Sequence, residues 1–398
     1  MIAAPEGLKE LKVKASAELV HILDWWSYRM IDLEQGGFLG RIDGHGIPIL
    51  QAPKGVILNA RILWTFSAAA RVYPDRKFYI HLAERAREYF RKNFFDGQHG
   101  GVYWMLDAAG SPLETKKQIY AQAFAMYALT ENYLLTRDAQ ILEQSYEFFL
   151  EIEKHSRDRE KGGYLEAFAR DWSALPDVRL SEKDTQAAKT MNTHLHILEA
   201  YTNLFRSRLK DDVGDALYKL IRLFLDKFIA AESGHLHLFF DEDWQLKSHE
   251  ISFGHDIETS WLLVEAAEVL HDETLLVKVQ EKALAMAEAT LPAYDEDGGI
   301  FNSAGPLGII DRAKEWWPQI EAVIGFVNAW QMSGEPTYLQ AAMQSWHFIE
   351  TKLIDREHGE WYWGLDAQGA PALYQDKAGP WKCPYHNGRG CLEIIRRL

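Results

Sequence analysis

Apolar residues recur along the chain at i, i+3, i+4 and i+7, which is typical of helices with one buried face. This pattern predicts about twelve helical segments. Their ranges are 6–30, 55–73, 76–94, 118–136, 139–154, 190–207, 213–231, 255–270, 273–291, 312–332, 337–354 and 384–397. Tight turns and longer loops alternate between the segments, which groups them into six helical hairpins.

The two helices of each hairpin differ in where their polar residues fall. The first is apolar nearly all round, as in AQAFAMYAL at 121–129, whereas the second carries a charged stripe, as in HLAERAREYFRKNF at 81–94. A helix that is apolar on all sides is buried, and a helix with a charged stripe lies at the surface. Six buried helices ringed by six outer ones form an all-α (α/α)6 barrel. An open solenoid of helix pairs is the alternative, but the unpaired first and last helices favour closure.

A glycine turn followed by aromatic residues returns six times, in the longer loops. The copies begin at Gly36, Gly100, Gly162, Gly234, Gly298 and Gly359. In the clearest copies an aspartate and a Gly/Pro turn follow, as at Asp107 and Asp366. A unit repeated from end to end indicates a repeat-built array. Since no linker or change of composition interrupts the repeat, we expect residues 1–398 to form one barrel domain with short, β-hairpin-like aromatic loops.

Composition narrows the range of partners. The net charge of −15 argues against nucleic acid or an anionic membrane as a partner. Cys383 and Cys391 fall eight residues apart in one predicted helix, too far for an unstrained disulfide, and two free thiols suit a reducing compartment. The N-terminal segment lacks an apolar signal core, and no apolar run approaches the length of a membrane span. We expect a cytoplasmic protein, either a monomer or a weak homo-oligomer.

The candidate chemistry gathers in the first turns of the predicted inner helices. In such a barrel these helices run parallel, so their first turns meet at one end. The residues there are Asn59 and Arg61; Tyr120 and Gln122; Asn192, His194 and His196; His255, Asp256 and Glu258; Trp316, Trp317, Gln319 and Glu321; and Trp381, Tyr385, His386, Asn387 and Arg389. Apolar walls with a few convergent polar groups describe a ligand pocket. Three histidines in equivalent places favour chemistry over separate buried ion pairs, and the tryptophans favour platforms for sugar rings.

Other chemistries fit the pattern less well. A metal site could use His196, His255, Glu258 and His386, but no HxH or HExxH pattern holds two ligands at one point. The two histidines of the HLH tripeptide fall on different helix faces. A glycoside hydrolase would need two opposed carboxylates, for which Glu258 and Glu321 are candidates, but three histidines are then surplus. The sequence has no dinucleotide fingerprint, P-loop or nucleophile elbow.

Four segments resemble the cellobiose 2-epimerases of the N-acylglucosamine 2-epimerase superfamily, and the likeness extends over nearly the whole chain. They are KTMNTHLHILEAYTNL (189–204), FGHDIETSWLL (253–263), KEWWPQIEAVIGFVNA (314–329) and WKCPYHNGRGCLEII (381–395). The resemblance implies an (α/α)6 barrel that uses no cofactor, and the lack of a convincing ligand set in the sequence predicts that no metal is bound. It also implies a sugar substrate whose reducing-end glucose or mannose unit is inverted at C2.

The resemblance further implies roles for individual residues. His255 and His386 match the acid/base pair, and His196 matches the third active-site histidine. Glu258 matches the carboxylate that supports a histidine, and Arg61 matches the arginine near the substrate oxygens. The positions that contact the sugar are matched by Tyr120, Asn192, Trp317 and Trp381, and Trp316 stands beside them. Asp184 is a further match, although its stretch, DTQAAKT, departs from the family's pattern.

The expected reaction opens the sugar ring, removes the C2 proton, passes through an enediolate and returns a proton to the other face. Histidine suits proton transfer near neutral pH, and Arg61 is suited to stabilise the oxyanion. The i, i+3 spacing predicts that Glu258 bonds to His255 and fixes its tautomer. His196 is assigned to ring opening or to a hydrogen bond with the enediolate. Three alternatives stay open: a monosaccharide 2-epimerase, an aldose–ketose isomerase, and a non-catalytic carbohydrate-binding protein.

Overall fold

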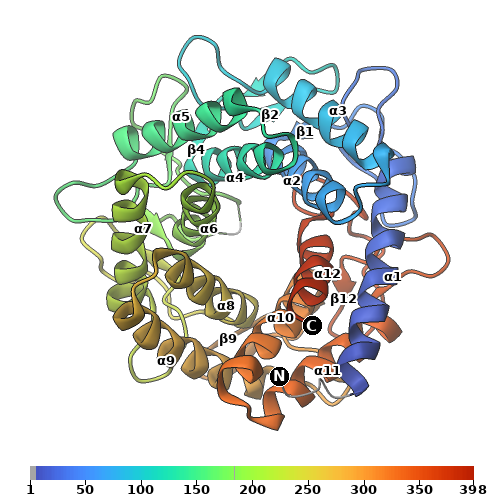
Figure 1. The fold of residues 1–398 in the computed structure, drawn as a ribbon, viewed down its shortest axis with the longest axis vertical. Coiled ribbons are helices and arrows are strands. Elements are labelled where there is room, and N and C mark those ends of the chain that lie inside the picture. Colours follow the sequence, from blue (N-terminus) through green and yellow to red (C-terminus); the bar gives the residue numbers. More distant parts are fainter. Residues whose placement is uncertain (1–5, 183) are drawn as a thin grey trace.

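The computed structural model describes residues 6–182 and 184–398, in which twelve α-helices form two concentric rings (Figure 1). The inner ring contains α2 (Val56–Val72), α4 (Ile119–Thr136), α6 (Met191–Ser207), α8 (Phe253–Leu270), α10 (Trp316–Ser333) and α12 (Tyr385–Arg397). The outer ring contains α1 (Glu6–Arg29), α3 (Lys77–Asn93), α5 (Ala139–His155), α7 (Asp211–Leu223), α9 (Glu273–Thr290) and α11 (Pro336–Phe348). Short π-helical or 3₁₀ turns extend three outer helices, at Phe224–Phe228, Leu291–Ala293 and Ile349–Leu353.

The inner ring is closed. Each inner helix packs on the next around the ring, and α12 packs on α2. A backbone bridge between Ile42 and Ala378 joins the first and last loops, and α1 packs on α12. The predicted (α/α)6 barrel is therefore confirmed. The open solenoid is wrong, because the first and last repeats are joined to each other.

The distribution of apolar residues explains which helices lie inside. In α4 every residue from Ile119 to Asn132 is buried, so this helix has no face for water. In α3 the buried residues form one stripe: Tyr79, Leu82, Ala83, Ala86, Tyr89 and Phe90. Most of the charged residues of α3 are exposed: Lys77, Glu84, Glu88, Arg91 and Lys92. The hydrophobic effect therefore assigns α4 to the inner ring and α3 to the outer ring.

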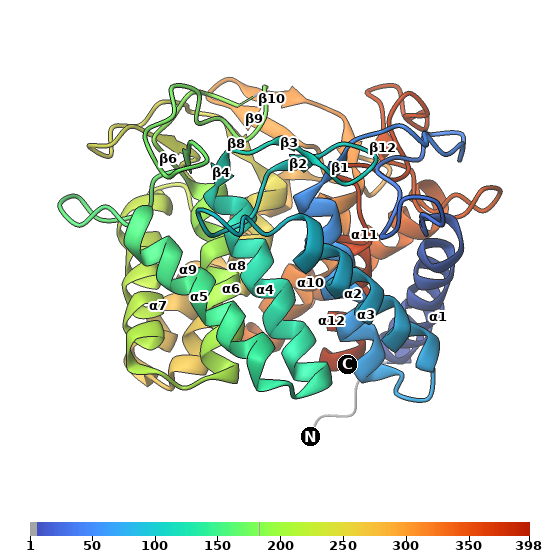
Figure 2. The ribbon, with the colours of Figure 1, turned by 90° about the horizontal axis from the view of Figure 1, so that it is seen from above.

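Short strands gather at one end of the barrel, beyond the first turns of the inner helices (Figure 2). Five of them directly precede an inner helix: β1 (Lys54–Gly55), β4 (Lys117–Gln118), β6 (Lys189–Thr190), β8 (Ile251–Ser252) and β11 (Lys314–Glu315). Each pairs antiparallel with a strand of the following loop, in turn β2 (Met105–Leu106), β5 (Ala167–Phe168), β7 (Phe239–Phe240), β9 (Ser303–Gly305) and β12 (Gly364–Leu365). β3 (Pro112–Glu114) and β10 (Gly308–Asp311) extend two of these pairs. The loops are thereby fixed around the mouth of the barrel.

Ion pairs that each contain a buried lysine attach the glycine turns to the rest of each loop. In the described chain, five such aspartate–lysine pairs recur at equivalent places, with N–O distances of 2.7, 3.0, 2.8, 2.7 and 2.6 Å for Asp32–Lys54, Asp96–Lys117, Asp158–Lys189, Asp295–Lys314 and Asp355–Lys377. A buried charge is costly unless it is paired. These pairs were not predicted from the sequence, although an aspartate recurs before the glycine turns and a lysine stands two residues before α2, α4, α6 and α10.

Two sequence-based expectations need correction. The helix predicted over 312–332 begins at Trp316, because residues 314 and 315 pair with the next loop as β11. Cys383 precedes α12 and does not share a helix with Cys391; both are buried free thiols. Within the described residues, no helix is long and apolar enough to cross a membrane.

Candidate active site

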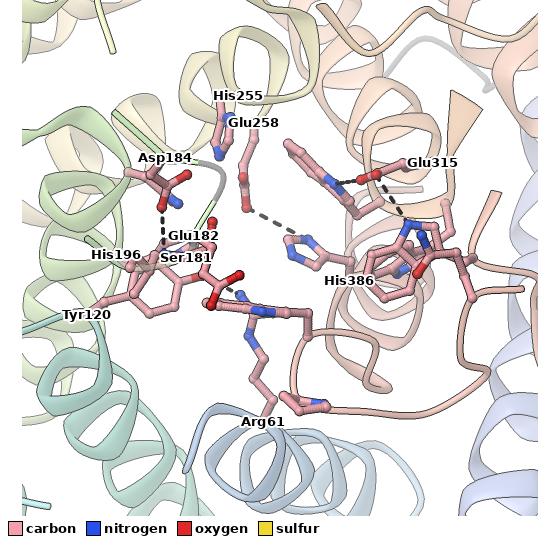
Figure 3. Close-up of a pocket in the computed structure, with 18 of the residues that line it drawn as sticks. Arg61, Tyr120, Ser181, Glu182, Asp184, His196, His255, Glu258, Glu315 and His386 are labelled. Atoms are coloured by element: carbon pink, nitrogen blue, oxygen red, sulfur yellow. Dashed lines mark hydrogen bonds and ion pairs between the residues drawn. The ribbon is translucent and has the colours of Figure 1, made fainter. Parts of the chain in front are cut away.

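A cavity of about 630 Å³ lies at the end of the barrel where the inner helices begin. All six inner helices contribute to its walls, and Figure 3 shows labelled side chains from several of them converging on it. Each residue that the family resemblance places in the site lines this cavity: Arg61, Tyr120, Asp184, Asn192, His196, His255, Glu258, Trp316, Trp317, Trp381 and His386. The loops add further residues, among them Trp104, Glu182, Trp363 and Gln375.

Some polar residues at the helix starts have a structural task instead of lining the cavity. Gln122, His194, Asp256 and Gln319 occupy equivalent helical positions. Each accepts a hydrogen bond from a backbone N–H directly after a glycine turn, at 2.8 to 2.9 Å. The inference that all polar residues at the helix starts face one pocket is therefore wrong for these four. They point toward the loops, because a shift of two residues turns a helical side chain through about 200°. The inference is also wrong for five others that do not line the cavity: Asn59, Glu321, Tyr385, Asn387 and Arg389.

His255 stands at the start of α8 with little electrostatic support. Its Nδ1 lies 2.7 Å from Oγ of Ser252, and its ring centroid lies 4.8 Å from that of Trp317. Burial lowers the pKa of His255 to about 4, because the imidazolium would lose its hydration. The predicted hydrogen bond from Glu258 to His255 is not formed. Glu258 instead pairs with Arg389, 2.6 Å away, since α12 offers it a charged partner.

His386, at the start of α12, has carboxylate neighbours that His255 lacks. Its Nδ1 lies 2.8 Å from Oε1 of Glu321 and 3.9 Å from Oε1 of Glu258. Burial lowers the pKa of His386, and the charge of Glu258 opposes that shift. Because an ionised carboxylate only accepts, the Nδ1–H of His386 donates to Glu321. The other ring nitrogen, Nε2, is then free of the N–H in the neutral ring.

His196 repeats this arrangement on α6. Its Nδ1 lies 3.0 Å from Oε2 of Glu199, one turn further along the same helix. Burial alone would raise the pKa of Glu199, but the charge of Arg389 and the hydrogen bond from His196 hold it at about 2. The imidazole of His196 packs edge-on against Tyr120, with 4.9 Å between ring centroids. Glu199 is therefore an ionised acceptor that orients the ring.

Arg61 brings a positive charge to the cavity wall from α2. One of its terminal nitrogens donates to the hydroxyl of Tyr120 at 2.9 Å, and its guanidinium stacks on the rings of Phe124 and Tyr385 at 4.3 and 4.7 Å. The charge stays on Arg61, since the surrounding groups raise its pKa. A fixed cation beside a cavity can stabilise a developing oxyanion.

Tryptophans form much of the remaining wall, and a carboxylate fixes two of them. Glu315 accepts hydrogen bonds from Nε1 of Trp317 at 3.0 Å and from Nε1 of Trp363 at 3.2 Å. Trp381 lies against Trp104, with 5.9 Å between centroids. Rigid indole faces of this kind are suited to the apolar faces of a sugar ring. Asp184 lies at the edge of the cavity, where it accepts a hydrogen bond from the backbone of Ser181.

Within the described chain, Glu258, Glu321 and His386 bring ligand atoms close enough to hold a metal ion. Their fit to a metal is poor, however, because Arg389 already lies between them. One guanidinium nitrogen of Arg389 is 2.6 Å from Oε1 of both glutamates. The side chain supplies the positive charge that a cation would bring. The same contacts place the two carboxylates side by side on one cation, unlike the opposed pair of a glycoside hydrolase.

Several residues of the site were not singled out in the sequence. Glu199 follows His196 at the i, i+3 spacing, which would have been a usable signal. Trp104 and Trp363 lie in the second and sixth aromatic loops, so the repeat itself pointed to them. No local pattern predicted the contact of Arg389 with Glu258 or that of Glu315 with Trp363, because these partners are far apart in the sequence.

Comparisons with known proteins agree with this geometry. The sequence profile of the N-acylglucosamine 2-epimerase family matches residues 37–388. A cellobiose 2-epimerase from Bacteroides fragilis is 47% identical over 387 residues, which is 97% of this chain and 98% of that protein. The solved structure of cellobiose 2-epimerase from Spirochaeta thermophila is 40% identical, with a TM-score of 0.92 and coverage of 100% of this chain and 98% of that one. That of the enzyme from Bacillus thermoamylovorans is 37% identical, with a TM-score of 0.93 and coverage of 98% and 100%. The chain therefore belongs to the N-acylglucosamine 2-epimerase family and is a carbohydrate isomerase.

Proposed function

We propose that this protein inverts C2 of the reducing-end glucose or mannose unit of a disaccharide of the cellobiose type. The observation that carries the proposal is the placement of His255 and His386 around Trp317. The indole lies 4.8 Å from one imidazole and 5.5 Å from the other, measured between ring centroids. A sugar held against Trp317 has a proton-transfer group near it from α8 and another from α12. Inversion at one carbon requires acid/base groups on both faces of that carbon.

The chemistry sets the order of events. The C2 proton becomes acidic only after the ring opens and C1 is a carbonyl. His196, oriented by Glu199, assists ring opening or hydrogen-bonds to the enediolate. Arg61 stabilises the negative charge that develops on the oxygens at C1 and C2. Reprotonation of the enediolate on its other face then yields the C2 epimer.

The working enzyme needs one neutral and one protonated imidazole in each direction. His255 is suited to be the neutral base, because burial lowers its pKa to about 4 and no carboxylate opposes that shift. Burial also lowers the pKa of His386, but Glu321 and Glu258, 2.8 and 3.9 Å from its Nδ1, favour its protonated form, and His255 has no such neighbours. We therefore assign the extra proton to His386. After one turnover the roles are exchanged, and the same pair serves the reverse reaction.

Several observations support a sugar of disaccharide size. A cavity of about 630 Å³ lies within the range that holds a drug-sized ligand. Within the described structure, Oδ1 of Asn192 is a buried acceptor without a partner, and the residue lines the cavity. A substrate hydroxyl would satisfy it. The second sugar unit would then lie at the outer edge, near Asp184, Glu182 and Trp381.

We further propose a cytoplasmic enzyme that works without a cofactor, as a monomer or a weak homo-oligomer, and without a nucleic-acid or membrane partner. The charge of −15 supports the last point, and two buried free thiols suit a reducing compartment. A monosaccharide 2-epimerase and an aldose–ketose isomerase remain the alternatives on this scaffold. They differ from the proposal in substrate length and in the carbon that receives the proton.

One experiment separates these reactions. The enzyme is incubated in D₂O with cellobiose, lactose, glucose or mannose, and the products are analysed by chromatography and NMR. We expect the two disaccharides to be converted to their C2 epimers, with deuterium at C2 from the first turnovers. Deuterium at C1 of a ketose would identify an isomerase, and conversion of only the monosaccharides would correct the substrate class. Complete retention of the original proton at C2 would rule out the two-histidine mechanism.

A further inference from the structure

Beneath the candidate active site, Arg389 joins four inner helices through one guanidinium. One terminal nitrogen is 2.6 Å from Oε1 of Glu258 on α8 and 2.6 Å from Oε1 of Glu321 on α10. The other terminal nitrogen bonds to Glu199 on α6, and it lies 2.6 Å from the hydroxyl of Tyr385 at the start of α12. Arg389 is only 1% exposed and does not line the active-site cavity. It therefore has no direct path to a substrate there.

Each of these three carboxylates approaches an active-site histidine. Oε2 of Glu199 is 3.0 Å from Nδ1 of His196, and Oε1 of Glu321 is 2.8 Å from Nδ1 of His386. Oε1 of Glu258 is 3.9 Å from the same nitrogen of His386. One guanidinium therefore contacts the carboxylates that bond to two histidines, His196 and His386, on different helices.

The cluster depends on this one cation. Three buried carboxylates in contact repel each other, and burial alone favours their protonated forms. Arg389 counters this, because its charge holds the pKa of Glu199 at about 2. At Glu321 burial raises the pKa, and the charge and hydrogen bond of Arg389 oppose that rise. A protonated carboxyl would donate to a histidine Nδ1 instead of accepting from it. The imidazole would then carry its proton on Nε2, which is the wrong nitrogen for a base facing the cavity.

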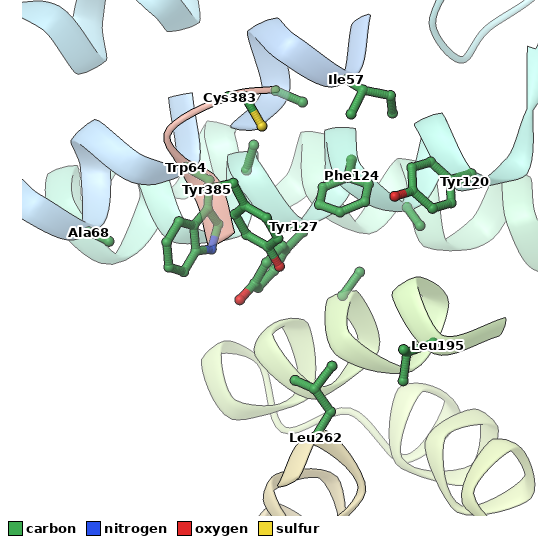
Figure 4. Close-up of a cluster of buried hydrophobic side chains, with 14 of the residues drawn as sticks. Ile57, Trp64, Ala68, Tyr120, Phe124, Tyr127, Leu195, Leu262, Cys383 and Tyr385 are labelled. Carbon is green, nitrogen blue, oxygen red and sulfur yellow. The ribbon is translucent and has the colours of Figure 1, made fainter. Parts of the chain in front are cut away.

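We propose that Arg389 is a positioning residue that keeps the carboxylates of Glu199 and Glu321 as hydrogen-bond acceptors and so holds His196 and His386 in the tautomer with the proton on Nδ1. The inference rests on the proposed function, because it assumes that His386 transfers a proton. Rings around Arg389 fix its plane: it stacks on Tyr385 at 4.4 Å and on Trp261 at 4.9 Å. Tyr385 is itself held in an aromatic cluster, in which Trp64, Phe124 and Tyr127 pack around its ring (Figure 4).

A second cavity, of about 570 Å³, reaches Arg389 from the other side of the cluster. Other charged residues of this cavity form ion pairs with each other, as in Arg71–Glu131 and Arg206–Glu265. The cavity does, however, offer a route for a small solute to the place of the guanidinium. Chemical rescue of a truncated side chain is therefore feasible.

The test compares Arg389→Met, Arg389→Lys and Arg389→Ala. We expect Arg389→Met to lower kcat by roughly 10²-fold while KM changes by less than about threefold, since no substrate contact is lost. The low-pH limb of kcat should move to higher pH, because removal of the cation raises the pKa of the carboxylates. Arg389→Lys keeps the charge, so the limb should return close to its original position. Guanidinium ion added to Arg389→Ala should restore part of kcat and the pH profile together.

A matched control and two outcomes make the test decisive. Arg397→Met removes another arginine of α12 that lies over Trp261, at 5.5 Å, and should leave the pH profile unchanged. An equal loss of kcat at every pH in both Arg389→Lys and Arg389→Met would show a merely structural role and overturn the inference. Retention of kcat in a folded Arg389→Met variant would also overturn the inference. If Arg389→Met does not fold, the pH profile of Arg389→Lys is used instead. If His386→Asn is also fully active, the proposed function fails; if it is inactive, only the role of Arg389 fails.

Discussion

Nδ1 of His386 lies 2.8 Å from Oε1 of Glu321, and this contact joins two inner helices that are far from adjacent in sequence. The carboxylate fixes which ring nitrogen carries the proton, and so it determines which nitrogen faces the cavity. His255 has a different environment, since its Nδ1 contacts only the hydroxyl of Ser252 among the hydrogen bonds described for it. The two histidines are therefore not equivalent, as an acid/base pair with distinct protonation states requires.

Replacing either histidine should remove the activity while keeping the fold. We expect His255→Asn and His386→Asn each to lower kcat by roughly 10²–10⁴-fold, the usual contribution of general acid–base catalysis. The control is His194→Gln on the inner helix α6. His194 accepts a hydrogen bond from a loop backbone N–H, and glutamine accepts the corresponding bond at the equivalent positions 122 and 319. Epimerisation assays should show near-normal activity for the control; retention of a tenth or more of the activity by either asparagine variant would exclude that histidine as an acid/base group.

The activity should extend to unusually low pH for a histidine-dependent enzyme. Burial lowers the pKa of His255 to about 4, so the ring stays neutral and able to accept a proton above that pH. As the pH falls through about 4, His255 becomes protonated and kcat/KM should decline. The measurement is a kcat/KM profile from pH 3.5 to 8, restricted to conditions in which circular dichroism shows a folded protein. A low-pH limb centred near 6.5 would contradict the role of a buried, uncompensated His255.

The paired glycines of the loops should differ in their tolerance of a side chain. Gly162 and Gly163 both have positive φ, at 77° and 79°. A Cβ on Gly162 would meet open space, whereas one on Gly163 would lie 2.6 Å from Trp244 and 2.9 Å from Nε2 of His194. We expect Gly162→Ala to cost about 1 kcal/mol of unfolding free energy from backbone strain, and Gly163→Ala about 1–3 kcal/mol more from overpacking. Urea denaturation of both variants measures the difference, and equal losses would show that the close approach has no energetic weight.

Removal of metal ions should leave the activity unchanged. The carboxylates that could bind a cation, Glu258 and Glu321, share a nitrogen of Arg389 at 2.6 Å. The expected result is full activity after dialysis against a strong chelator, measured beside an untreated sample. Loss of activity that one added divalent ion restores would reassign His386 and its neighbours as metal ligands.

The architecture could be predicted from the amino-acid pattern, because the signals for it are local and repeated. The 3.6-residue periodicity located the helices, and the contrast between AQAFAMYAL and HLAERAREYFRKNF showed which helices would be buried. The six glycine turns indicated a repeat, and the polar first turns of the inner helices located the cavity. These signals depend only on the spacing of residues that are close in the sequence, so they can be found without knowing how the helices pack.

Which of these polar residues face the cavity and which face the loops depends on the tertiary packing of the helices. Gln122 and His194 point to loop backbones, whereas Tyr120 and His196, each two residues away, face the cavity. That division depends on how each helix is rotated about its axis, and the rotation is set by packing against both neighbours in the ring. The sequence paired Glu258 with His255 because they are three residues apart, but the charge of Arg389 on another helix is the stronger partner at 2.6 Å. Contacts between side chains of different repeats leave no spacing in the sequence, and so the network that orients the histidines exists only once the barrel has closed.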